Sequence, residues 1–207
     1  MLTPKQIRIF QAFMEKPHKE MTYREIKEYC REKSNSIIQK AVIKFLADEL
    51  ILKREVGNII LYRANLDNTL VFSYFDILAK EKLPKAVKLC LKIIKEEVSD
   101  MAFVSIVLFG SYAESKHTEK SDLDIALFVG SGEDKRKCRL AIKSAGLKCV
   151  LAIDAHVFTQ DELLEMLKDK QENLGKQIAK KHLAIHNPSI FYSIISQGIE
   201  NGFKVAY

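Results

Sequence analysis

The fold of this chain is decided by two neighbouring stretches, Leu108-Phe109-Gly110-Ser111-Tyr112-Ala113 and Ser121-Asp122-Leu123-Asp124-Ile125-Ala126-Leu127-Phe128-Val129. They predict an apolar strand, a Gly-Ser turn, a polar loop and a second strand that opens with two carboxylates. Alternate residues of a strand share a face, so Asp122 and Asp124 should lie about 6–7 Å apart. Two like charges beside a buried core need a cation or a proton. A divalent metal that holds a phosphate chain is the usual solution.

The bulk composition is that of a globular protein. Of the 207 residues, 47% are apolar and 29% are charged, and no stretch reaches the roughly 18 uncharged apolar residues of a membrane helix. The first residues lack the apolar core of a signal peptide, and the four cysteines form no CxxC pair, so we expect a cytoplasmic protein with reduced thiols. The net charge of +6 is compatible with a nucleotide or nucleic-acid partner.

The first 66 residues predict three helices and a hairpin. Thr3-Pro4 and Thr22-Tyr23-Arg24-Glu25 are helix-start patterns, and Ser34 can cap a third helix. Two β-rich runs then flank Gly57-Asn58, which predicts a two-residue hairpin turn. This order resembles a winged helix-turn-helix domain, which would place the third helix in a DNA major groove. The side chains that would meet DNA are Gln39, Lys40, Lys44, Lys53, Arg54 and Arg63. The alternatives are ordinary solvated charges and a protein-binding or dimerising module.

The rest of the chain predicts a second domain of mixed helices and strands, giving an α+β protein. Residues 67–83 should form a linker with a short helix from Leu70 to Leu78, and residues 84–207 the second domain. Expected elements of that domain are an amphipathic helix from Pro84, strands at 102–109, 122–129 and 148–159, a helix at 132–145, a charged helix at 160–185 and a last helix from Asn187-Pro188.

One acid interrupts the apolar strand at 148–159. Asp154 lies between Ile153 and Ala155, and a buried carboxylate without a partner is costly. If this strand pairs with the strand at 122–129, Asp154 completes a triad with Asp122 and Asp124. Three carboxylates suit one or two Mg²⁺ ions whose remaining positions are filled by phosphates.

These residues together resemble the DNA polymerase β-like nucleotidyltransferase superfamily, and most of all its minimal prokaryotic members. The resemblance covers about residues 84–207. It implies that Gly110 and Ser111 hold the terminal phosphates of a nucleotide, that Asp122 and Asp124 bind Mg²⁺, and that Asp154 completes the catalytic metal site. One departure concerns the loop, where Ser115 stands at a position that the family often fills with a second glycine.

The resemblance implies transfer of a nucleoside monophosphate from an NTP, with ATP the first candidate, to an acceptor hydroxyl. The acceptor could be a small molecule, a protein side chain or an RNA end, and no membrane is involved. The alternative is a DNA-binding regulator whose second domain senses nucleotide or dimerises without catalysis. Two histidine features stay open: His156 shares the strand face of Asp154, and His182 and His186 have the i, i+4 spacing of a metal pair, for which an exposed helix face is the simpler interpretation.

Overall fold

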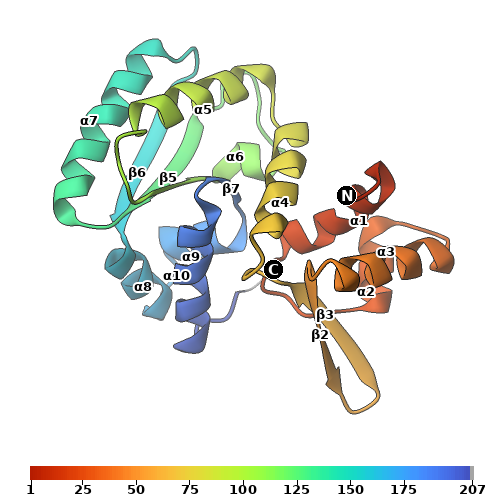
Figure 1. The fold of residues 1–207 in the computed structure, drawn as a ribbon. Helices are drawn as coiled ribbons and strands as arrows, with labels where there is room; N and C mark the ends of the chain where they lie inside the picture. Colours follow the sequence, from red (N-terminus) through yellow and green to blue (C-terminus); the bar gives the residue numbers. More distant parts are fainter. Residues whose placement is uncertain (206–207) are drawn as a thin grey trace. The chain divides into compact units, whose positions relative to one another are not determined.

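The computed structural model describes residues 1–205 as an α+β protein, which confirms the predicted fold class (Figure 1). The chain divides into two compact units, residues 1–78 and a second that begins at Ala79. Among the described residues, no helix is both long enough and apolar enough to cross a membrane. The predicted domain boundaries at residues 66 and 84 remain predictions.

The first unit contains the predicted three helices and hairpin. Its elements are α1 (Pro4–Glu15), β1 (Met21–Thr22), α2 (Tyr23–Cys30), α3 (Asn35–Ala47), β2 (Ile51–Val56) and β3 (Ile59–Ala64), and α4 (Thr69–Lys82) begins in this unit. Thr3 and Thr22 close capping boxes with Gln6 and Glu25, so these two predicted helix starts are confirmed. Ser34 precedes α3 as predicted, but its side chain makes no capping hydrogen bond. The predicted linker helix is present but longer than expected: α4 extends to Lys82 instead of ending at Leu78.

An aromatic cluster holds the first unit together. Phe10, Phe13 and Phe45 are fully buried, and the rings of Phe10 and Phe45 meet edge to face at 5.1 Å. Such geometry adds to the stabilisation from apolar burial. The hairpin pairs Ile51 with Ala64 through to Val56 with Ile59. The sequence did not predict β1, which pairs with β3 and gives the sheet order β1-β3-β2.

The second unit is built on a mixed four-stranded sheet. Its elements are α5 (Lys85–Glu97), β4 (Val104–Leu108), α6 (Gly110–Ala113), β5 (Leu123–Val129), α7 (Gly132–Lys148), β6 (Ile153–Thr159), α8 (Gln160–Lys168), α9 (Leu174–Lys180), β7 (Leu183–His186) and α10 (Pro188–Glu200). The strand order is β6-β5-β4-β7, in which β5 and β6 run parallel and the other pairs are antiparallel. The strands at β5 and β6 begin later than predicted, at Leu123 and Ile153.

Helices pack against the sheet of the second unit. α7 packs against α5, β5 and β6, whereas α10 packs against β4 and α8 (Figure 1). Phe128 lies four residues beyond Asp124 on the same strand face, and its ring contacts that of Phe191 in α10 at 5.3 Å. Asp124 and its register partner Asp154 therefore lie four residues along the strands from this contact with α10.

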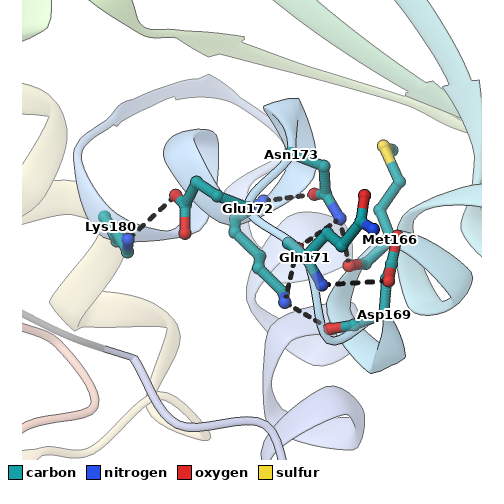
Figure 2. Close-up of polar contacts among 7 residues, drawn as sticks. Met166, Asp169, Gln171, Glu172, Asn173 and Lys180 are labelled. Carbon is teal, nitrogen blue, oxygen red and sulfur yellow. Dashed lines mark hydrogen bonds and ion pairs between the residues drawn. The ribbon is translucent and has the colours of Figure 1, made fainter.

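The prediction of one charged helix over residues 160–185 is wrong. The structure has α8, α9 and strand β7 in that stretch. The break lies at residues 169–173, where the Asn173 amide donates to the Met166 carbonyl at 2.7 Å and its oxygen accepts from the Lys176 N–H at 3.1 Å (Figure 2). Asn173 thus ends one helix and caps the next, a role for which its short polar side chain is well suited.

Candidate active site

Three carboxylates gather at the amino ends of two parallel strands. Asp124 in β5 and Asp154 in β6 are register partners in the sheet, and Asp122 directly precedes β5. Burial raises the pKa of the Asp124 carboxyl above its usual value, and the negative charges of Asp154 and Asp122 raise this pKa further. The condition placed on Asp154, that its strand pairs with the strand of Asp124, is met.

Gly110 brings the turn after β4 directly against Asp124. Its φ is +64°, and a Cβ on this residue would lie 2.1 Å from the Asp124 Oδ2 atom. Any residue with a side chain would therefore clash with the carboxylate and also adopt an unfavourable backbone conformation. The backbone N–H of Ser111 donates to the Asp124 carboxylate, which opposes the rise of its pKa. The Gly-Ser pair and the acids thus form one site.

The loop between the turn and β5 is tied down by its own contacts. The Tyr112 hydroxyl donates to the Ser121 carbonyl at 3.3 Å, and its ring stacks on His117 with centroids 4.5 Å apart. Tyr112 is buried and acts as a structural residue of the loop. Ser115 has a φ of +58°. The position where the family often has glycine therefore does adopt the left-handed backbone that favours glycine.

His156 adjoins the site from β6. Its Nε2 atom lies 3.5 Å from the Asp154 Oδ1 atom. The ring is flanked by Phe109 at 6.0 Å and by Phe158, to which it is nearly parallel, at 6.1 Å. Of these neighbours, the i, i+2 spacing indicates only Phe158, because Phe109 comes from the strand-to-turn segment far away in the sequence.

The other histidine pair has a structural role, and its interpretation as an exposed helix face is wrong. His182 precedes β7 and is buried, with Nδ1 2.8 Å from the Ile178 carbonyl and Nε2 3.2 Å from the Tyr192 hydroxyl. A carbonyl only accepts, so Nδ1 carries the proton and Nε2 accepts from Tyr192. Burial lowers the pKa of His182 to about 4. His186 lies in β7, and its Nε2 atom is 3.2 Å from the Asn187 amide.

The side chains that the sequence assigned to DNA binding are spread over α3 and the hairpin of the first unit. Gln39 and Lys40 are exposed on α3, and Arg63 is exposed on β3. The remaining cations have acidic partners: Lys44 pairs with Asp48 at 2.7 Å, Lys53 with Glu55 at 2.5 Å, and Arg54 with Glu20, to which its Nε donates at 2.7 Å.

The acids are arranged as an open platform and not as a closed metal cage. Within residues 1–205, no three His, Cys, Asp or Glu side chains converge on a ready-made metal position. The donors at the site are nevertheless all carboxylate oxygens, which are the ligands that Mg²⁺ prefers. Burial and, after it, the charges of Asp154 and Asp122 raise the pKa of Asp124, and a bound cation would favour its charged form.

A comparison with protein families identifies the family to which this site belongs. The family described as the nucleotidyltransferase domain matches residues 87–203, which is more than half of the chain and contains the Gly-Ser turn and all three acids. A search of curated proteins finds no match. The matched segment runs from α5 to the end of α10, so it includes the whole mixed sheet. The chain therefore belongs to the nucleotidyltransferase domain family.

Proposed function

We propose that this protein is a Mg²⁺-dependent enzyme that transfers a nucleoside monophosphate from an NTP, with ATP the first candidate, to an acceptor hydroxyl and releases pyrophosphate. The carrying observation is that Asp124 is at once the register partner of Asp154 and the residue packed against Gly110. Asp124 thereby connects the acids that could bind metal to the Gly-Ser turn that could bind phosphate, and nucleotidyl transfer needs both groups in one site.

Gly110 and Ser111 are the proposed phosphate-binding residues. A glycine lets the backbone approach a phosphate closely, and the hydroxyl and amide of the following serine are donors suited to its oxygens. The Ser111 N–H is occupied by the Asp124 carboxylate in this structure. We infer that a bound nucleotide competes with Asp124 for this donor.

Asp122, Asp124 and Asp154 are the proposed ligands for Mg²⁺. One or two bound ions would polarise the α-phosphate and neutralise charge on the attacking and leaving oxygens. Asp154 is more accessible than its register partner Asp124, with 58% of its side chain exposed. It is the proposed acceptor of the proton that the hydroxyl loses as its oxygen attacks the α-phosphorus and the bond to the pyrophosphate oxygen breaks.

Label transfer from α-phosphate-labelled ATP in the presence of Mg²⁺ tests the proposal. We expect Asp124→Asn and Asp154→Asn to reduce transfer at least about 100-fold, since each removes a charge that stabilises the transition state. Asn at 124 can still accept from the Ser111 N–H, so the fold should persist. The matched control is Asp100→Asn, an exposed acid beyond α5. Full transfer by both site variants would refute the assigned site.

A second proposed function is DNA binding by the first unit, either beside catalysis or instead of it. Its support is the order of α2, α3 and the hairpin, together with Gln39 and Lys40 exposed next to each other on α3. Binding of duplex DNA should weaken steeply with salt, because phosphate contacts release counterions. We expect Lys40→Ala to weaken it and Lys33→Ala, outside the helix, to leave it unchanged. No binding at low salt would exclude this function.

A further inference from the structure

The hairpin of the first unit ends in an unprotected sheet edge. In the part of the chain that the structure describes, β2 pairs with β3 alone and lies at the edge of the order β1-β3-β2 (Figure 1). Every residue of β2 except Ile51 is exposed. An edge strand of this kind presents free N–H and C=O groups to another chain unless something blocks it.

The free backbone groups of β2 belong to its odd-numbered residues. The Asn65 N–H donates to the Leu50 carbonyl at 3.0 Å, and Leu50 and Asn65 continue the register of the hairpin. Ladder bonds alternate along an antiparallel pair, so Leu52, Arg54 and Val56 bond to β3. The backbone groups of Lys53 and Glu55 therefore point outward, where a neighbouring strand would bind.

The two faces of the hairpin differ in chemistry. Lys53 lies opposite the buried Tyr62 and shares its face with Glu55. The other face carries apolar side chains at its tip, where Val56 and Ile59 are cross-strand partners with exposed fractions of 46% and 55%. Leu52 and Leu61 lie on the same face, where they alternate with Arg54 and Arg63, and all four help to line a hollow of about 510 Å³ whose other lining residues are His18, Glu20 and Lys53.

The charges along β2 are complementary to those of the same strand turned around. A two-fold axis perpendicular to the sheet keeps each face together, so it must lie midway between the two copies of one residue and pair odd with odd and even with even. An axis at Lys53 or at Glu55 would oppose two like charges. An axis at Arg54 places Lys53 of each copy opposite Glu55 of the other. It also places Leu52 of each copy opposite Val56 of the other.

We propose that two copies of this chain associate through antiparallel pairing of their β2 strands about Arg54. In this register the outward backbone groups of Lys53 and Glu55 bond to those of the second copy. Because Lys53 and Glu55 of one strand already form an ion pair, the four side chains make a square in which every neighbour has the opposite charge. The apolar surfaces of the two hairpins then become continuous.

The positive charges of the two Arg54 side chains at the axis are neutralised within each copy. Arg54 would face Arg54 of the second copy, and like charges directly opposite each other destabilise a sheet. Each Arg54 is already paired with Glu20 of its own chain, so the net charge at the axis is close to zero. An edge strand that carries only lysines repels a second copy of itself and is thereby protected. The charges of β2 have both signs, so they favour pairing with a second copy.

Charge exchange on the full-length chain tests the proposal without any nucleotide, so its outcome is independent of the proposed catalysis. Analytical ultracentrifugation should find a dimer of the natural chain. Lys53→Glu and Glu55→Lys should each raise the dimer dissociation constant at least about tenfold, because each opposes two like charges. The double variant should dimerise again. An equimolar mixture of the two single variants should form a heterodimer, since their strands are complementary to each other.

Lys33→Glu is the matched control, since it changes the same charge at an exposed position outside the hairpin. Circular dichroism of each variant establishes that it is folded. A natural chain that stays monomeric at the highest concentration would overturn the proposal. So would single variants that dimerise as tightly as the natural chain, or a mixture that shows no heterodimer.

Discussion

At the scale of single residues, Ser115 carries a backbone strain that a glycine would remove. Its φ of +58° costs a residue with a Cβ about 1–2 kcal/mol. Glycine would avoid this strain, but it loses more conformational entropy on folding, so the net gain in stability is smaller. We expect Ser115→Gly to raise the free energy of unfolding by about 0.5–1 kcal/mol in urea denaturation. Ser99→Gly, an exposed serine without positive φ, should lower it slightly. Equal effects of both substitutions would contradict this explanation.

His182 makes stability depend on acid. Its pKa is lowered from 6.5 to about 4 by burial, so the unfolded chain takes up a proton before the folded one does. Stability from the neutral ring is complete above about pH 6.5 and is lost as pH falls towards 4, by up to about 3 kcal/mol. Urea midpoints measured across this window should fall less steeply for His182→Gln. An unchanged slope would show that another group controls the acid transition.

At the scale of elements, the sequence predicted those that carry their own local signals. The capping boxes at Thr3 and Thr22 and the Gly57-Asn58 turn are confirmed because each is decided within a few residues. Strands β1 and β7 have two and four residues, too few for a period to show, and each exists only because a distant strand pairs with it. The same reason separates the acids: Asp122 and Asp124 form a local pattern, whereas Asp154 depends on the pairing of β6 with β5.

Two glycines let α9 and α10 approach α8, and they should respond differently to substitution. A Cβ at Gly175 would lie 2.7 Å from the Met166 Cβ atom, close to the backbone, whereas the atom nearest to a Cβ at Gly198 would be the Leu167 Cδ1 atom at 2.7 Å. The end of a leucine can rotate away and a Cβ cannot. We expect Gly175→Ala to lower the free energy of unfolding by about 1–3 kcal/mol and Gly198→Ala by clearly less. The reverse order in urea denaturation would contradict this packing.

At the scale of the whole molecule, the two units divide the proposed functions. The acids and the Gly-Ser turn all belong to the unit that begins at Ala79, whereas α3 and the β2 edge belong to residues 1–78. Lys44, Lys53 and Arg54, which the sequence indicated as candidate DNA contacts, have acidic partners in the fold. The partners of Lys44 and Lys53 lie four and two residues away in the sequence, whereas the pairing of Arg54 with Glu20 depends on which elements meet in space.

This division predicts where a nucleotide acts. ATP with Mg²⁺ should stabilise the folded state by about 2.7 kcal/mol at a hundred times its dissociation constant, and either alone should do less, since the triphosphate and the carboxylates repel each other without the cation. Hydrogen exchange read by mass spectrometry should slow at α6 and at the amino ends of β5 and β6. It should not slow within α3 or the hairpin. Asp124→Asn should abolish the protection, because it removes a proposed metal ligand. Protection that appears instead in residues 1–78, or that needs no Mg²⁺, would place nucleotide binding outside the acid platform.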